Sequence, residues 1–319
     1  MTAPTTPVMI EAHDLTKYYG DFVGVEKVNF TVRKGEVVGL LGPNGSGKTT
    51  TMRMLTGFMP PTSGTCRIAG HDVLADSLEA RRAIGYLPET VPLYTDMTVE
   101  DYLDFMGTIR GLSKQYLTRR IGQVVDLCRL GTYRRSHIAK LSKGYRQRVG
   151  IAQAILHEPQ VLIMDEPTVG IDPIQVVETR QLIKSLGEEH TILLSTHILP
   201  EVSMICRRVL IIHEGAMVAE DTPANLAQRL RVTDRIEAEI RGPASAVTNA
   251  LRAIPGVSNV TRTGEGDVST YHVDFRSDAD PRETISKLVI SNNWGLRKLN
   301  PMSMSLEEIF LRLTLNEEG

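Results

Sequence analysis

Short runs of apolar residues recur along the first two thirds of the chain, separated by longer stretches of mixed polarity. Each run has four or five mostly apolar positions, which is typical of a strand buried on both faces. Because these runs alternate with stretches of helical periodicity, the pattern predicts an α/β fold with a parallel sheet. The runs expected as sheet strands are residues 37–41, 161–164, 192–195 and 209–212.

Two more segments near the start also have strand character. Residues 8–12 are mostly apolar, and residues 28–32 alternate apolar and polar positions, as expected of a strand with one buried face. From about residue 90 to residue 157, the apolar positions mainly follow the spacing of helices. A helical insertion between the first sheet strand and the later ones predicts a helical subdomain.

The pattern changes near residues 222–232, and the remaining segments follow the order β-α-β-β-α-β, the ferredoxin-like arrangement. A capping box at 305–308 then starts a last helix with an apolar stripe through residue 313. We therefore expect two domains, 1–230 and 231–319. The second would serve as a ligand-sensing regulatory module, or else as a dimer-stabilising or spacer domain. Its expected elements are strand 236–240, helix 244–254, strand 257–262, turn 264–267, a strand carrying Tyr271, Val273 and Phe275, helix 281–291 and strand 296–299.

The composition is that of a soluble globular protein. The 319 residues are 41% hydrophobic and 23% charged, enough for one large and one small domain. A net charge of −2 gives no electrostatic argument for nucleic acid as a partner, and we expect none. The start of the chain has no signal-peptide pattern, and no apolar run approaches the ~18 residues of a membrane span. Any role at a membrane should therefore go through a partner.

The cysteines have no spacing typical of metal ligands. Cys66, Cys128 and Cys206 are scattered along the sequence. We expect reduced thiols that pack as small apolar side chains in a cytosolic protein.

Residues 42–49 carry the chemistry that organises the rest of the sequence. They match the phosphate-binding pattern G-x-x-x-x-G-K-[ST], directly after strand 37–41 and before an expected helix at 49–55. Glycine-rich backbone N–H groups, a helix N-terminus and one lysine suit a polyphosphate. Lys48 should reach the β- and γ-phosphates, and the Thr49 hydroxyl should ligate Mg²⁺. The expected nucleotide-binding residues here are Gly42, Pro43, Asn44, Gly45, Ser46, Gly47, Lys48, Thr49 and the adjoining Thr50.

Two acidic residues end the apolar run 161–164. Adjacent carboxylates at the end of a buried strand are costly unless they meet a cation. With a phosphate-binding loop in the same chain, Asp165 is expected to bind Mg²⁺, directly or through water. Glu166 would then polarise an attacking water as the catalytic base.

A second site for an anion is expected at residues 141–148, Leu-Ser-Lys-Gly-Tyr-Arg-Gln-Arg. Ser142 is a good N-cap for the amphipathic helix that follows. The positive end of that helix would then lie beside a serine hydroxyl and the backbone of Gly144.

These motifs together resemble the ATP-binding subunit of an ABC transporter over residues of about 8–225. The resemblance rests on their order: the loop 42–49, Leu-Ser-x-Gly at 141–144, Asp-Glu-Pro at 165–167, Gly-Ile-Asp at 170–172, and His197 after Leu-Ser-Thr. It implies a P-loop NTPase fold, in which a RecA-like core carries an antiparallel β subdomain and a helical subdomain. It also implies that two subunits pair head to tail around two ATP molecules. Each site would join the P-loop of one protomer to the Leu-Ser-x-Gly segment of the other.

The resemblance implies roles for individual residues. Tyr19 should stack on the adenine, with Tyr18 as the alternative, since an aromatic face accepts a flat base. His197 should sense the γ-phosphate and position Glu166 and the water. Asp172 would lie at the dimer interface, although its place before Pro173 also suits a helix cap. The other expected interface residues are Ser142, Lys143, Gly144 and Tyr145.

This sequence departs from the usual family pattern at three positions. Glu89 stands where a glutamine usually contacts Mg²⁺ and the attacking water, and a carboxylate is a stronger ligand for a hard cation. Lys143 and Tyr145 replace the usual glycine and glutamine of the Leu-Ser-x-Gly segment. Within the family, 86–89 and 141–145 look most like the gliding-motility type of bacterial exporter ATPase.

The preferred hypothesis is an ATPase that binds ATP and Mg²⁺, forms an ATP-dependent homodimer and drives a separate integral membrane permease. It would work in the cytoplasm at the inner face of the membrane, and an exporter is expected. In this family the 89–97 loop and the helices after it contact the permease. A P-loop alone would also permit a kinase or a GTPase, but the Leu-Ser-x-Gly segment favours the ABC family. The alternative is a soluble ABC-type ATPase that acts as a mechanical clamp or assembly factor without a permease.

Overall fold

The computed structural model describes residues 6–230, 234–264, 266–276 and 280–302. The chain divides into two compact units, Met1–Pro223 and Ala224–Gly319, and each is described by itself. The capping box and helix expected at 305–313 lie outside the described residues.

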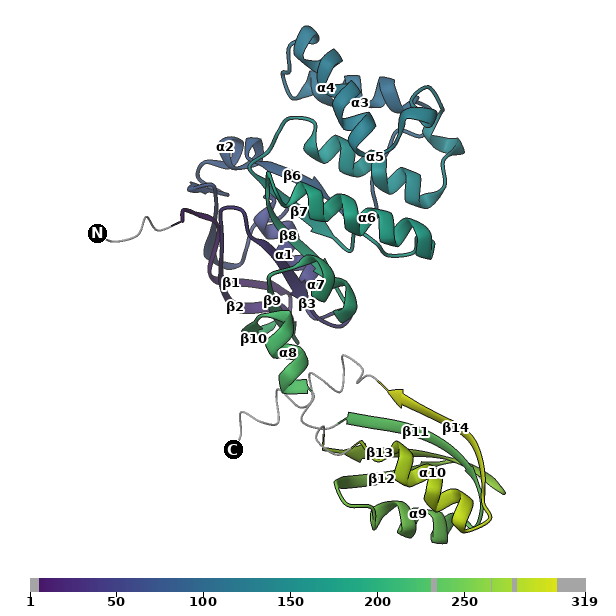
Figure 1. Cartoon of the computed structure of the whole chain (residues 1–319). Coiled ribbons are helices and arrows are strands. Elements are labelled where there is room, and N and C mark those ends of the chain that lie inside the picture. The colour runs from purple at the N-terminus through teal and green to yellow at the C-terminus, as the bar shows by residue number, and fades with distance from the viewer. Residues whose placement is uncertain (1–5, 231–233, 265, 277–279, 303–319) are drawn as a thin grey trace, which may run out of the picture. The chain divides into compact units, whose positions relative to one another are not determined.

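A six-stranded sheet forms the centre of the first unit (Figure 1). Its strand order is β10-β9-β3-β8-β7-β6, parallel from β9 to β6, with β10 antiparallel at the edge. The predicted parallel α/β sheet is therefore confirmed. Every residue of β3, β7 and β8 is buried, which explains why these strands are continuous apolar runs. The bounds are β3 Val37–Leu41, β6 Ile84–Leu87, β7 Val161–Asp165, β8 Thr191–Thr196, β9 Arg208–His213 and β10 Ala216–Asp221.

An antiparallel sheet with the order β2-β1-β4-β5 forms the second layer of this unit. Its strands β1 and β2 are longer than the predicted segments 8–12 and 28–32, because the polar hairpin between them continues their pairing. Helix α1, Lys48–Leu55, shares one hydrophobic core with both sheets through residues such as Met52, Leu15 and Leu193. The bounds are β1 Val8–Tyr19, β2 Phe22–Arg33, β4 Ser63–Ile68 and β5 His71–Asp72.

The predicted helical subdomain is present. Helices α3, α4 and α5 pack on one another and project from the sheets in Figure 1. Helices α6 and α7 follow β7 and β8. Besides α1, the helices of the first unit are α2 Ser77–Arg82, α3 Val99–Ile109, α4 Lys114–Leu127, α5 Lys143–Ile155, α6 Pro173–Leu186 and α7 Leu199–Ile205, with short 3-10 helices at Gly131–Tyr133 and Ile138–Lys140. Helix α8, Pro223–Leu230, starts at the last residue of this unit and continues into the second.

The second unit has the predicted β-α-β-β-α-β order. Its antiparallel sheet has the strand order β12-β13-β11-β14, the ferredoxin-like topology. Tyr271, Val273 and Phe275 are buried on one face of β13, as their alternation predicted, and they pack with residues of both helices. The bounds are β11 Asp234–Arg241, α9 Ala244–Arg252, β12 Val257–Thr263, β13 Val268–Phe275, α10 Arg282–Ser291 and β14 Gly295–Met302.

Candidate functional site

The loop 42–47 connects the end of β3 to the first turn of α1. Gly45 and Gly47 have φ values of +82° and +103°, which non-glycine residues adopt only with strain. A Cβ on Gly47 would also lie 2.7 Å from the carbonyl oxygen of Gly24. The two glycines therefore let the loop wrap tightly around the N-terminus of α1, where backbone N–H groups suit an anion.

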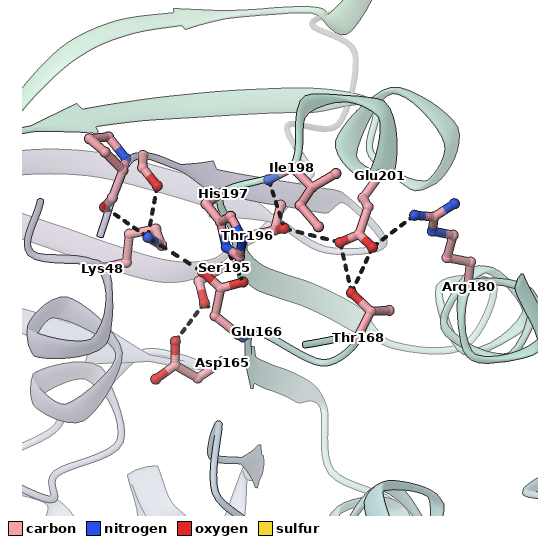
Figure 2. Close-up of polar contacts among 12 residues, drawn as sticks. Lys48, Asp165, Glu166, Thr168, Arg180, Ser195, Thr196, His197, Ile198 and Glu201 are labelled. Atoms are coloured by element: carbon pink, nitrogen blue, oxygen red, sulfur yellow. Dashed lines mark hydrogen bonds and ion pairs between the residues drawn. The ribbon is translucent and has the colours of Figure 1, made fainter. Parts of the chain in front are cut away.

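Lys48 is buried at the first position of α1. Its Nζ donates hydrogen bonds to the carbonyl oxygens of Gly42 at 2.8 Å and Pro43 at 3.0 Å. The same ammonium lies 3.4 Å from Oε1 of Glu166. The lysine is thus held by the loop itself and directed towards the acidic residue after β7 (Figure 2).

A cleft of about 430 Å³ lies over this loop. It brings together six of the nine residues predicted for nucleotide binding in 42–50 with the three predicted catalytic residues. Its lining consists of Phe22, Gly24, Asn44, Gly45, Gly47, Lys48, Thr49, Thr50, Glu89, Glu166, Val169 and His197. Of the remaining predicted loop residues, Ser46 is buried, and Gly42 and Pro43 contribute the carbonyl groups that hold Lys48.

The two acidic residues at the end of β7, Asp165 in the strand and Glu166 directly after it, share one partner, Ser195 near the end of β8. The Ser195 hydroxyl donates to Oδ1 of Asp165 at 2.5 Å and accepts the backbone N–H of Glu166 at 3.0 Å. Glu166 has a φ of +48°, a left-handed conformation that costs about 1–3 kcal/mol at a non-glycine residue. The turn at Glu166 directs its side chain into the cleft, while the Asp165 side chain remains beneath it.

His197 completes the pairings of Glu166. Its Nδ1 lies 3.0 Å from Oε2 of Glu166. The two carboxylate oxygens of Glu166 therefore contact different partners, Lys48 on one side and His197 on the other. Glu166 is only 6% exposed, so its carboxylate depends on these two groups in place of water.

The predicted metal-ligating residues meet at the boundary of two cavities. Thr49, Glu89 and Asp165 all line a second cavity of about 830 Å³, and Thr49 and Glu89 also line the nucleotide cleft. Oδ2 of Asp165 is buried and has no hydrogen-bond partner within the described part of the chain. A buried carboxylate oxygen in this condition fits a cation or a cation-bound water. Burial, and then the negative charge of Asp165, raise the pKa of Tyr86 in the same cavity to about 12.

Residues 141–145 and 170–175 form a separate cluster that does not line the nucleotide cleft. Ser142 caps α5 by accepting the N–H of Tyr145, as predicted. Asp172 caps α6 by accepting the N–H of Gln175 at 3.0 Å. The carboxamide of Gln175 lies directly against Gly144, where a Cβ would be 1.3 Å from its Oε1.

The substituted residues of this cluster also make intramolecular contacts. Nζ of Lys143 lies over Gly170, where a Cβ would be 2.2 Å away. The ring of Tyr145 lies 4.2 Å from that of Tyr133 and below the guanidinium of Arg148. The predicted interface residues are therefore gathered on one surface of the protomer.

Neither of the two tyrosines predicted to face the base lines the cleft. The Tyr19 ring packs on Gly24, with its hydroxyl 3.5 Å from Oγ1 of Thr50. Tyr18 instead donates to Glu26 at 2.8 Å. Phe22, which sequence reasoning missed, is 64% exposed and lines the cleft itself. The signal that could have found it was an aromatic residue directly after the Gly20-Asp21 turn, at the start of β2.

Comparisons with known proteins agree with this geometry. Residues 25–169 match the family model described as ABC transporter. The chain is 32% identical over 313 residues to the linearmycin resistance ATP-binding protein LnrL of Bacillus subtilis, covering 96% of this chain and 98% of that protein. The chain belongs to the ABC transporter family.

Two further relatives extend the comparison. The bacitracin transport ATP-binding protein BcrA of Bacillus licheniformis is 34% identical over 307 residues, covering 96% of this chain and 97% of that protein. A solved ATP-binding subunit of an ABC transporter superposes with a TM-score of 0.63 at 34% identity, covering 69% of this chain and 92% of that one. This family member is therefore the ATP-binding, ATP-hydrolysing subunit of a transporter. Among its described residues, no helix is long and apolar enough to cross a membrane.

Proposed function

We propose that this chain powers an exporter by hydrolysing ATP at the cleft above residues 42–49, with Glu166 as the catalytic base. The observation that carries the proposal is the position of Glu166 between Lys48 and His197, at 3.4 Å and 3.0 Å. Lys48 would bind the β- and γ-phosphates, because its ammonium already lies within the phosphate-binding loop. Glu166 would then exchange its contact with Lys48 for a contact with the attacking water.

His197 orients the base in this mechanism. Its Nδ1 contacts Oε2 of Glu166, which leaves Oε1 to receive a proton from water. The other ring nitrogen is available to the γ-phosphate, which would account for phosphate sensing. Because His197 keeps Oε2 of this buried carboxylate in place, only the contact between Oε1 and Lys48 has to change before the reaction.

Mg²⁺ would be held by the Thr49 hydroxyl, Glu89 and Asp165, together with phosphate oxygens. Support comes from the unpaired Oδ2 of Asp165 and from the shared cavity of the three residues. When bound, Mg²⁺ neutralises charge on the transferred phosphoryl group. Ser195 would keep Asp165 in place, because it holds Oδ1 and leaves Oδ2 free for the metal.

The complete site would be shared between two copies of the chain. Subunits of this family generally dimerise and pair with a permease. Ser142 and Lys143 are exposed, outside the cleft of their own protomer. They would bind the γ-phosphate of ATP held by the second copy, since the capped N-terminus of α5 attracts anions. A phosphate entering there would displace the Gln175 carboxamide from Gly144.

The permease would dock in the cavity of about 830 Å³ that adjoins the cleft. Exposed apolar side chains there include Tyr94, Phe105, Ile109 and Phe58, as expected of a surface covered by a partner. Glu89 lines both cavities and could relay ATP binding to the permease. The ATPase subunit would then work at the inner face of the membrane.

Residues 231–319 would act as an accessory domain, regulatory or dimer-stabilising. This proposal is supported by the separate hydrophobic core of these residues.

The exporter assignment is supported by the names of the relatives. The matched proteins from the two Bacillus species are named for linearmycin resistance and bacitracin transport, and both matches span nearly the whole chain. This favours transport over a soluble clamp that works without a permease. The narrower gliding-motility branch stays a prediction from residues 86–89 and 141–145.

The substitution Glu166→Gln tests the proposal. It keeps the shape of the side chain and removes its basicity, so ATP turnover should be lost while ATP binding remains. A stable ATP-bound dimer should then be detected by light scattering after size exclusion. Glu188→Gln, an exposed change on the same unit, is the control. Normal ATP turnover in Glu166→Gln would show that Glu166 is not the catalytic base. A variant that stays monomeric with ATP would contradict a site shared between two copies.

A further inference from the structure

A second buried carboxylate lies outside the nucleotide cleft. Glu201 is on the short helix α7 and is 2% exposed. Its carboxylate accepts hydrogen bonds from the hydroxyl of Thr168 at 2.7 and 2.8 Å and from that of Thr196 at 3.0 Å. Nη2 of Arg180 donates to it at 2.8 Å. Figure 2 shows these groups beyond Thr196, on the side opposite Lys48 and Asp165.

The partners of Glu201 are all donors. A buried carboxylate loses its hydration, so its charge must be matched within the protein. Arg180 supplies the positive charge, and the threonine hydroxyls satisfy the remaining acceptor positions. Both oxygens of the carboxylate are therefore hydrogen-bonded, which holds the Glu201 side chain in one orientation, although Nε of Arg180 has no partner within the described residues. Neutral glutamine in place of Glu201 would turn an amide group towards these donors, and at least one hydrogen bond would be lost.

The three partners come from the segments that carry the proposed catalytic groups. Thr168 is two residues after Glu166, and Thr196 directly precedes His197. Arg180 is on α6, the helix that Asp172 caps. Thr196 is held further because its Oγ1 also accepts the N–H of Ile198 at 3.1 Å. One carboxylate therefore joins both sides of the Glu166–His197 contact to the middle of α6.

We propose that Glu201 is a positioning residue for ATP hydrolysis: by anchoring Thr168 and Thr196 it keeps His197 Nδ1 on Glu166 and ties this pair to the 167–172 loop. This inference rests on the roles proposed above for Glu166 and His197. Glu201 should have no part in binding ATP, because within the described residues neither the P-loop nor Lys48 contacts its carboxylate. Loss of Glu201 should therefore reduce kcat and leave the KM for ATP nearly unchanged.

The expected effect of Glu201→Gln is a fall in kcat of about 10- to 100-fold, the size that a misplacement near 1 Å produces. KM for ATP should stay within about twofold. Thr168→Val removes the bridging hydroxyl with little change of volume and should show the same pattern more weakly. Glu201→Asp keeps the charge and should recover part of the rate.

The control is Glu36→Gln, which breaks a different partly buried ion pair, to Arg208 at 2.7 Å. Glu36 precedes β3, at the end of the strand opposite the P-loop. If Glu201 acted only on stability, both variants would lower Tm and neither would change kcat per folded molecule. Equal kcat in Glu201→Gln and Glu36→Gln would overturn the inference.

A double variant provides the decisive comparison. If Glu201 acts through His197, then Glu201→Gln should cost little more once His197→Ala is present, and the two losses should not multiply. Single-turnover hydrolysis of ATP labelled at the γ-phosphate, by the full chain, measures such slow rates. Multiplying losses would overturn the positioning role. If Glu166→Gln and His197→Ala both hydrolyse ATP at the normal rate, the proposed function itself is wrong. If these two variants are impaired and Glu201→Gln hydrolyses ATP at the normal rate, only the positioning inference is wrong.

Discussion

The hydroxyl of Ser195 donates a hydrogen bond of 2.5 Å to Oδ1 of Asp165, across two neighbouring strands of the parallel sheet. The same oxygen receives the N–H of Glu166. Ser195 is completely buried, so water cannot replace it if it is removed. The geometry of both acidic residues therefore depends on one hydroxyl group.

Ser195→Ala should lower both ATP turnover and stability. Each buried group left without a partner costs about 1–3 kcal/mol, and the left-handed turn at Glu166 would lose its anchoring bond. We expect kcat to fall at least about tenfold, because the base would no longer be held in one orientation. ATPase assays and urea unfolding measure the two effects. The control is Ser185→Ala, on the exposed side of α6; equal behaviour of the two variants would contradict the role of Ser195.

Lys48→Ala should abolish nucleotide binding. The substitution removes the ammonium that lies in the phosphate-binding loop, and among the described residues it leaves the Glu166 carboxylate in contact with His197. Fluorescent ATP titration should give no saturable signal, whereas the exposed Lys34→Ala should bind like the unmodified chain. Retained affinity in Lys48→Ala would show that the cleft is not the phosphate site.

Glu89→Gln should change the response to Mg²⁺. Glu89 lines both the nucleotide cleft and the adjoining cavity, and its carboxylate is a stronger ligand for a hard cation than a carboxamide. The Mg²⁺ concentration that half-saturates ATPase activity should rise several-fold in the variant. Glu188→Gln controls for the loss of one negative charge elsewhere on the unit. An identical Mg²⁺ titration would mean that Glu89 does not face the metal.

Much of the site was predictable because its parts are local in sequence. Composition and spacing identify residues 42–49 and the acidic pair after 161–164. Unbroken apolar runs identify the buried strands. Strand β6 was not expected, since Gly85 and Tyr86 interrupt its apolar character. Its pairing with β7 is decided by the tertiary structure.

The supporting contacts could not be predicted, because they join residues far apart in the chain. Ser195 is 30 positions from Asp165, and Thr168 is 33 from Glu201. Serine, threonine and glutamate are common on the ends of strands and helices, so neither residue type nor local spacing distinguishes these. Similarly, only the folded chain reveals that Gln175 covers Gly144.

The cysteines should be unreactive in the native protein. Cys66, Cys128 and Cys206 are free and buried, and burial raises the pKa of each thiol to about 12. Since the thiolate is the reacting species, a thiol-specific dye should label none of them at pH 8 until urea unfolds the chain. Rapid labelling of the native chain would contradict the packing. Nucleotide should not alter the result, because none of the three lines the cleft.

His157 should make the protein less stable in mild acid. Burial, and then the charge of Arg110, lower its pKa from 6.5 to about 4. Between these values the unfolded chain binds more protons than the folded one, so the free energy of unfolding falls as pH falls. The loss should be about 2 kcal/mol at pH 5 and at most about 3 kcal/mol below pH 4. Urea unfolding at pH 5 and 7.5, followed by circular dichroism, measures it. His157→Gln should lose less stability over this interval than the unmodified chain, whereas the exposed His13→Gln should follow the unmodified chain. An equal loss in His157→Gln would assign the acid sensitivity to other groups.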